Sequence, residues 1–279
     1  MDYKSLTTES VNPASKNIDK MSALEIVTVI NNEDKTVPCA IEKVLPQIAE
    51  AIEQTAERLK NGGRLIYIGA GTSGRLGIID ATECPPTYGV SSEMIQGIIA
   101  GGNECVFRAA ENEEDKPEVG RADLEAKNFT AKDVCMGISA SGSAAYVAGA
   151  LEYAKSLGAL TIALSCNPNS RIAGIADIAI SPEVGPEVIS GSTRMKAGTA
   201  QKLVLNMIST GVMIRMGRVY GNRMKYMRPA NKKLLDRAVR IIQAELGDDC
   251  NAEYDEIVKA IKETGGSIPD TVEMLRNGK

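Results

Sequence analysis

The chain of 279 residues is 43% hydrophobic and 24% charged, a composition typical of a globular protein with one large domain or one domain plus an appendage. Its formal net charge of −4 argues against nucleic acid or an anionic membrane surface as the main partner. The absence of histidine excludes Ser-His-Asp and Cys-His catalysis, H-E-x-x-H zinc sites and every imidazole acid or base.

The first 63 residues divide into an irregular arm and a helical segment. Residues 1–20 are polar, with turn chemistry at Asn12-Pro13. From residue 21 onward Leu, Ile and Val recur at helical spacing until Gly62-Gly63, a pair that signals a helix end. We therefore expect an N-terminal helical arm before the first strand.

Between residues 64 and 216 short apolar runs alternate with helical patterns, and several runs end in turns of small residues. The alternation predicts an α/β fold, a doubly wound parallel sheet with helices on both faces in three layers. The strands are expected within residues 64–71, 94–102, 133–143, 159–170 and 175–180.

Prolines are expected to limit two helices of this region. The helix after the first glycine turn is expected to stop at Pro85 and Pro86 after about three turns, because proline lacks the N–H that a helix interior needs. The charged segment 106–127 is expected to be helical with an interruption near Pro117.

Beyond about residue 230 the pattern is helical only. The expected organisation is an N-terminal arm and helix (1–50), the α/β domain (51–222) and a small C-terminal helical subdomain (223–279).

The six cysteines are scattered and form no C-x-x-C pair, which indicates reduced cysteines of a cytoplasmic protein. Without such pairs or histidine, no catalytic transition metal is expected. The polar N-terminus predicts no signal peptide, and no stretch approaches the roughly 18 apolar residues of a membrane helix. Proton transfer at neutral pH must then fall to Glu, Asp, Lys, Tyr, Cys or water.

Three turns rich in glycine and hydroxyl groups lie where ligands bind in such folds, at the carboxyl ends of strands or before a long helix. They are "GAGTSGR" (69–75), "SASGS" (139–143) and "SGSTRMKAGTA" (190–200). Each turn alone is explained by tight turns and helix capping. Together they favour a small ligand carrying a phosphate, which backbone N–H groups and helix dipoles can hold.

The first turn also matches G-x-G-x-x-G, the pattern of dinucleotide-binding proteins. That reading requires an acidic residue at the end of the second strand, and this strand ends in "IIAGG" with no carboxylate before Glu104. The expected helix break at Pro85 and Pro86 also argues against it. A nicotinamide or flavin site is therefore disfavoured.

Two regions supply candidate catalytic carboxylates. Glu83 follows a short apolar helix and precedes Cys-Pro-Pro. Glu111, Glu113, Glu114 and Asp115 lie in the run "AAENEEDK", and charge runs of this kind are usually solvated helix faces. The residues alone leave the choice among these four open.

Four segments resemble the N-acetylmuramic acid 6-phosphate etherases, a family of sugar isomerase (SIS) domain proteins. They are "NPASKNIDKMSALEIVTVINNEDKTVPCAIEKVLP", "LIYIGAGTSGRLGIIDATECPPTYGV", "SCNPNS" and "ISPEVGPEVISGSTRMKAGTAQKLVLNMISTG", and the match spans most of residues 10–222.

This resemblance implies a cytoplasmic lyase that removes D-lactate from the C3 ether of N-acetylmuramate 6-phosphate by elimination and rehydration, with no metal or organic cofactor. It implies Glu83 as the acid, Glu114 as the second catalytic glutamate, and a homodimer whose subunits jointly build the site. The residues expected to bind the phosphorylated amino sugar are Gly71, Thr72, Ser73, Ser139, Ser141, Ser192, Thr193 and Lys196.

The sequence departs from the family in two places. Where the etherases read A-S-G-R-T-P-Y, this chain has Ser143, Ala144 and Ala145 in place of Arg, Thr and Pro, so a threonine that usually donates to phosphate is absent. The stretch 222–234 also differs. The altered turn 143–145 keeps one alternative open, a non-catalytic sugar-phosphate sensor like the related glucokinase regulatory protein. A further alternative is an aldose–ketose isomerase of the same fold.

Overall fold

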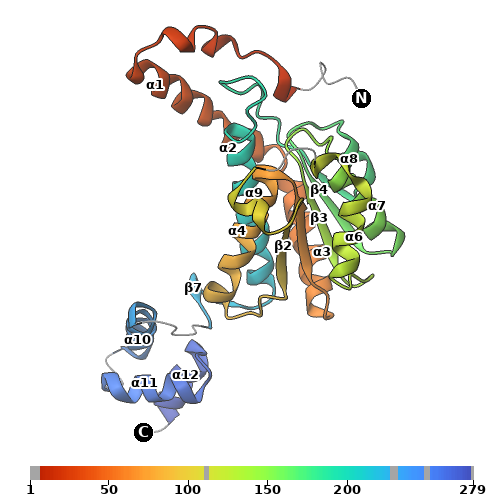
Figure 1. Cartoon of the computed structure of the whole chain (residues 1–279). Coiled ribbons are helices and arrows are strands. Elements are labelled where there is room, and N and C mark those ends of the chain that lie inside the picture. Colours follow the sequence, from red (N-terminus) through yellow and green to blue (C-terminus); the bar gives the residue numbers. More distant parts are fainter. Residues whose placement is uncertain (1–6, 110–112, 227–231, 248–251, 278–279) are drawn as a thin grey trace. The chain divides into compact units, whose positions relative to one another are not determined.

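The computed structural model describes residues 7–109, 113–226, 232–247 and 252–277. The chain forms two compact units (Figure 1). The first comprises Met1–Thr82 and Glu93–Val212, so the described part of the arm, residues 7–50, belongs to the same unit as the sheet. The second comprises Glu83–Ser92 and Met213–Lys279.

The first unit contains a five-stranded parallel sheet, which confirms the predicted doubly wound architecture. The strands lie in the order β2-β1-β3-β4-β5, so β1 and β3 are neighbours. The chain adds β2 on one side of β1 and then β3, β4 and β5 on the other side, which makes the position between β1 and β3 the topological switch point. The registers place Gly69 beside Ile138, and Ile138 beside Leu164, so the carboxyl ends of the central strands share one edge. The strands are β1 (Leu65–Gly69), β2 (Ile95–Ile99), β3 (Val134–Ile138), β4 (Leu160–Leu164) and β5 (Ile178–Ile180).

Helices cover both faces of this sheet because its central strands are apolar on both sides. Every residue of β1, β3 and β4 is buried. Ile66 and Ile68 face a core that includes residues of α6 and α7, whereas Tyr67 faces α4. The helices that begin in this unit are α1 (Ala23–Asp34), α2 (Thr36–Glu42), α3 (Leu45–Lys60), α4 (Gly71–Tyr88), α5 (Glu104–Phe107), α6 (Pro117–Ala126), α7 (Ala145–Ser156), α8 (Arg171–Ile175) and α9 (Lys196–Arg215).

The expected helical segment before the first strand is present as three helices, α1 to α3. The expectation that Pro85 and Pro86 stop the helix after the first glycine turn is wrong, because α4 continues to Tyr88. The two prolines lie in its last turn, so the helix ends within two residues of Pro86, and the N–H of Gly89 still donates to the carbonyl oxygen of Pro85 at 3.0 Å.

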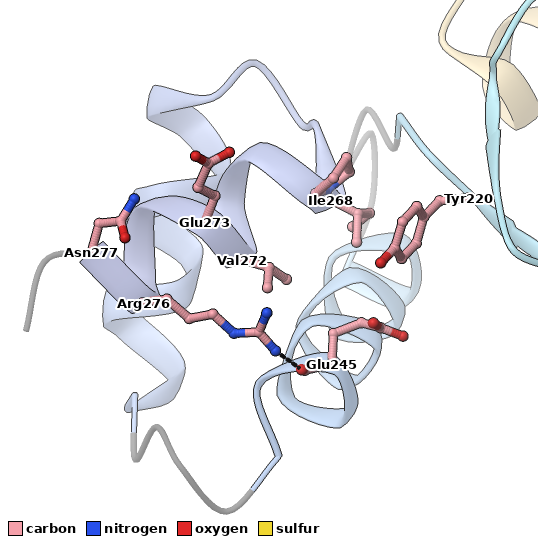
Figure 2. Close-up of a pocket in the computed structure, with 8 residues that line it drawn as sticks. Tyr220, Glu245, Ile268, Val272, Glu273, Arg276 and Asn277 are labelled. Atoms are coloured by element: carbon pink, nitrogen blue, oxygen red, sulfur yellow. Dashed lines mark hydrogen bonds between the residues drawn. The ribbon is translucent and has the colours of Figure 1, made fainter.

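The second unit is mainly helical, as the pattern after residue 230 predicts. Its apolar core is formed by residues such as Val239, Ile242, Ile257 and Ile268. A pocket of about 290 Å³ lies beside it, where Arg276 donates to the backbone carbonyl of Glu245 at 2.7 Å (Figure 2). The elements are β6 (Val219–Tyr220), β7 (Arg223–Met224), α10 (Lys232–Leu246), α11 (Tyr254–Glu263) and α12 (Ile268–Asn277).

Among the helices of the described ranges, none is long and apolar enough to cross a membrane.

Helices α6 and α7 approach each other through two glycines. A Cβ on Gly120 would collide with the carbonyl oxygen of Tyr146, and one on Gly149 with the carbonyl oxygen of Pro117. The contact fixes α7, whose first turn follows β3, against the rest of the unit.

Replacing Gly149 by Ala is expected to lower the free energy of unfolding by about 1–3 kcal/mol, because the added methyl group overpacks a backbone contact. The matched control is Gly174→Ala on α8, where no atom lies within 4 Å of the added Cβ. The control should leave stability unchanged or raise it by up to about 1 kcal/mol through helix propensity. Urea unfolding of both variants checks this, and equal effects would contradict the packing argument.

Candidate functional site

A pocket of about 330 Å³ lies at the carboxyl ends of β1 and β3, and the three glycine- and hydroxyl-rich turns all contribute to it. Its volume is at the small end of the range of roughly 300–1,000 Å³ that is usual for ligand pockets. The described lining residues are Ala70, Gly71, Thr72, Ser73, Glu114, Ile138, Ser139, Ala140, Ser141, Ser143, Ala144, Gly191 and Thr193.

The first turn places the beginning of α4 in the pocket. Gly71 has a φ of +53°, and a Cβ on Gly74 would collide with the carbonyl oxygen of Gly69. Only glycine therefore allows the strand to turn so sharply into the helix. The first N–H groups of α4 have no intrahelical partners, so this turn presents donors and a positive dipole end to a ligand.

Ser73 of this turn is held from behind by α9. Its hydroxyl donates to Oε1 of the buried Gln201 at 3.1 Å. The Nε2 of Gln201 has no hydrogen-bond partner among the described residues. No local pattern predicts this contact, because the two residues lie on different helices.

The second turn carries three serines. The Ser139 hydroxyl accepts from the backbone N–H of Gly142 at 3.1 Å, and the hydroxyls of Ser141 and Ser143 lie 2.7 Å apart. Helix α7 begins at Ala145, and the side chain of Ala144 offers no cap to its N–H groups. The first turn of α7 therefore also keeps backbone donors for a ligand. The sequence analysis did not include Ser143 among the binding residues.

The third turn contributes Gly191 and Thr193 to the pocket, but not Ser192 or Lys196. The Lys196 side chain is only 4% exposed, and its ammonium group lies 2.6 Å from Oε2 of Glu33 on α1. The lysine is therefore paired within the fold.

Glu187 occupies the N-terminus of α9. Its two carboxylate oxygens accept from the backbone N–H groups of Lys196 and Ala197, each at 2.9 Å. Its charge therefore complements the positive end of the α9 dipole. The α9 N-terminus is therefore already occupied by a carboxylate of the protein. Within the described chain, the first and second turns are the ones whose helix N-termini, those of α4 and α7, remain available to a ligand.

The surroundings of Glu33, which pairs with Lys196, lower the pKa of its carboxyl group. Partial burial raises its pKa, but hydrogen bonds with Lys196 and Asn12, together with the charge of Lys196, lower it more. The net pKa lies below the ordinary value of a glutamate. The ion pair is therefore complete at neutral pH.

The candidate carboxylates are placed differently. Glu114 lies in the short 3-10 turn Glu113–Asp115 and lines the pocket. Glu113 instead pairs with Lys116 at 2.8 Å, and Glu111 lies outside the described residues. Glu83 lies near the C-terminal end of α4 and belongs to the second unit.

The buried thiols are poor candidates for proton transfer. Burial raises the pKa of the Cys166 thiol to about 12 and that of the Cys135 thiol higher still. Neither group supplies a thiolate near neutral pH. Among the described residues, no cluster of three or more His, Cys, Asp or Glu side chains could hold a metal ion.

Two family models match the chain. The SIS domain model matches residues 114–210, and that of the glucokinase regulatory protein N-terminal SIS domain matches residues 47–155. Among solved structures, a phosphoheptose isomerase from Francisella tularensis superimposes with a TM-score of 0.53 at 18% identity, covering 70% of this chain and 100% of that one. One from Neisseria gonorrhoeae has a TM-score of 0.53 at 22% identity, covering 68% and 98%. These likenesses concern the fold.

Relatives of much higher identity carry one name. An N-acetylmuramic acid 6-phosphate etherase from Clostridium beijerinckii is 54% identical over 275 residues, which cover 99% of this chain and 89% of the relative. The etherase of Photorhabdus laumondii is 51% identical over 278 residues, covering 100% and 91%. N-acetylmuramic acid 6-phosphate etherase 2 of Vibrio cholerae is 57% identical over 251 residues, covering 90% and 81%.

Replacing Glu33 by Gln is expected to lower the free energy of unfolding at neutral pH by about 3 kcal/mol, because it leaves the buried Lys196 ammonium without a counter-charge. The folded pKa of Glu33 is depressed, so its contribution is complete above the unfolded pKa of about 4.3 and is lost as pH falls through the folded value. Urea unfolding of both proteins across this range should show their difference closing at acid pH.

The matched control is Glu125→Gln, which breaks the exposed pair of Arg121 and Glu125 at 2.8 Å. Its effect should be below about 1 kcal/mol, as for other surface pairs. An effect of Glu33→Gln as small as this control, or a difference that widens toward acid pH, would contradict the buried ion pair.

Proposed function

The chain belongs to the N-acetylmuramic acid 6-phosphate etherase family, and we propose that it cleaves the lactyl ether in the pocket at the ends of β1 and β3. It is an enzyme, a carbon–oxygen lyase. The sensor and isomerase alternatives lose support because relatives of this identity are named etherases.

One observation carries the proposed binding mode: two helix N-termini and a group of hydroxyls converge on a pocket whose described lining includes the carboxylate of Glu114. The N-termini of α4 and α7, with Thr72, Ser139 and Ser141, suit the 6-phosphate group of the sugar. Ser143 and Ser139 supply hydroxyls beside Ala144, where the family has a threonine. Phosphate fixed in this way orients the sugar ring toward Glu114.

We propose that Ser192 and Lys196 support the pocket without contacting the substrate. The Lys196 ammonium is committed to Glu33, and the Ser192 N–H donates to the carbonyl oxygen of Ile189 at 2.9 Å. Both residues therefore support the loop before α9, whereas Thr193 of the same loop lines the pocket.

The proposed reaction uses two carboxyl groups with opposite duties. Opening of the ring gives a C1 aldehyde that acidifies the C2 proton, which Glu114 removes as base. The bond from C3 to the lactyl oxygen breaks, and Glu83 gives a proton to that oxygen, which releases D-lactate. Water then adds its hydroxyl at C3 and a proton returns to C2, so N-acetylglucosamine 6-phosphate is the product. No metal or organic cofactor takes part in this scheme.

The acid is proposed to come from a second copy of the chain. The first residues of α4 line the pocket, whereas Glu83 lies near the other end of that helix. A homodimer in which each pocket combines Glu114 of one subunit with Glu83 of the other would supply both groups.

We also infer a cytoplasmic enzyme with no nucleic-acid partner, since the net charge is −4 and the described cysteines are free thiols.

Incubation with N-acetylmuramic acid 6-phosphate in D₂O is expected to release D-lactate and to leave deuterium at C2 of the product, because the C2 proton returns from solvent. Mass spectrometry of the product checks this. Release of lactate without deuterium would reject elimination, and absence of lactate would reject the etherase assignment.

Glu83→Gln and Glu114→Gln are each expected to lower lactate release by at least about a hundredfold, which is the usual contribution of a general acid or base. The matched control is Glu113→Gln, since Glu113 pairs with Lys116 and does not line the pocket. This control should retain wild-type activity. Full activity of either of the first two variants would contradict its proposed role.

Co-refolding the two inactive variants in equal amounts tests the shared pocket. About half of the dimers would be mixed, and each would hold one site with both glutamates intact, so about a quarter of wild-type activity should return. A mixture that stays inactive would show that one subunit supplies both groups.

A further inference from the structure

The turn Ser165–Ser170 lies behind the second phosphate-binding turn, and the reaction scheme assigns it no role. Asn167 of this turn is 5% exposed, and its side-chain amide connects two distant segments of the first unit. One segment is the start of the N-terminal arm at Thr7 and Thr8, and the other is the wall of the pocket at Ala140 and Ser141.

The two ends of this amide have different partners. The oxygen, Oδ1, accepts from the backbone N–H of Thr7 at 3.1 Å and from the Thr7 hydroxyl at 2.9 Å. The nitrogen, Nδ2, donates to the carbonyl oxygens of Ser141 at 3.2 Å and Ala140 at 3.4 Å, and to the Thr8 hydroxyl at 3.4 Å. Donors surround the oxygen and acceptors surround the nitrogen, so the orientation of the amide is fixed by its neighbours.

The surroundings make this link rigid. Thr8 is fully buried and Asn12 is 4% exposed, so the arm is packed where it meets the domain. The backbone N–H of Cys166 also donates to the carbonyl oxygen of Ala140 at 2.8 Å. Both Ala140 and Ser141 line the pocket.

We infer that Asn167 is a positioning residue that sets the conformation of the turn Ser139–Ser143 and uses the docked N-terminal arm as its support. The inference rests on the proposed function, because that turn is proposed to hold the phosphate of the substrate. Asn167 acts on Ser141 through its backbone carbonyl and does not itself line the pocket.

Asn167→Asp separates the two contacts. The aspartate keeps an oxygen that accepts from Thr7, and its second oxygen can accept from the Thr8 hydroxyl. That second oxygen, however, lies against the carbonyl oxygens of Ala140 and Ser141, where the amide donated. Repulsion should displace the turn while the arm stays docked. Asn167→Ala removes both contacts, so it should release both the arm and the turn.

The matched control is Asn61→Asp. The Asn61 amide also donates to a backbone carbonyl, that of Glu57 at 3.0 Å, but the residue is exposed at the end of α3 and does not line the pocket. The same chemical change is thereby made at a site where no effect on substrate binding is expected.

Two measurements test the inference. Steady-state release of D-lactate should show KM raised about tenfold in Asn167→Asp with kcat within about threefold of wild type, because binding of the phosphate is lost equally from ground and transition states. Hydrogen exchange should be faster at residues 139–143 in both Asn167 variants, and faster at residues 7–10 only in Asn167→Ala.

Wild-type KM and unchanged exchange at 139–143 in Asn167→Asp would overturn the inference, as would a rise in KM of the same size in Asn61→Asp. A fall in the thermal stability of Asn167→Asp without a change in its KM would assign Asn167 a purely structural role, and this result would also overturn the inference. If the wild-type protein releases no lactate, the proposed function fails, while hydrogen exchange still decides whether Asn167 positions the turn.

Discussion

The pocket depends on backbone N–H groups that α4 and α7 leave without intrahelical partners at one edge of the parallel sheet. Because β1 and β3 are neighbours with their carboxyl ends in register, the first turns of the two following helices meet at that edge. The glycines at 71 and 74 allow the backbone to make the first of these turns. An acidic protein can therefore attract a phosphate without a cluster of basic side chains.

The N-terminus of α9, the third at this edge, also binds a negative charge, but that charge belongs to a side chain of the protein. Glu187 of the protein itself occupies the N-terminus of α9, and the Lys196 ammonium is neutralised by Glu33. The charges of Glu187 and Lys196 thus have partners within the fold, and Thr193 of the loop before α9 lines the pocket. Asn167 is likewise paired within the fold, because its side-chain amide is hydrogen-bonded both to Thr7 of the arm and to Ser141 of the pocket wall.

Local sequence patterns were sufficient for most of the fold, because apolar runs and helical spacing reflect burial within single elements. The strands, the parallel sheet and the C-terminal helices follow from such patterns. The path of α4 through Pro85 did not, because the missing N–H of proline predicts a helix end, whereas the helix continues for three residues beyond it. Among the carboxylates, Glu114 could be singled out only through resemblance to the etherases, because an acidic run by itself indicates a solvated surface.

The contacts that support the pocket were beyond sequence reasoning. The bond from Ser73 to Gln201 and the link from Thr7 to Asn167 join residues far apart in the chain, and no spacing rule predicts them. They depend on how helices and turns pack after the sheet has formed. The sequence thus located the turns that line the pocket, while the structure identified the contacts that hold them in place.

A crystal structure with N-acetylglucosamine 6-phosphate bound would test the central claim most directly. The account predicts the phosphate within hydrogen-bond distance of backbone N–H groups in the first turns of α4 and α7, with C2 and C3 of the sugar facing Glu114. A phosphate bound instead by the Lys196 ammonium, or a sugar lodged outside this pocket, would contradict it.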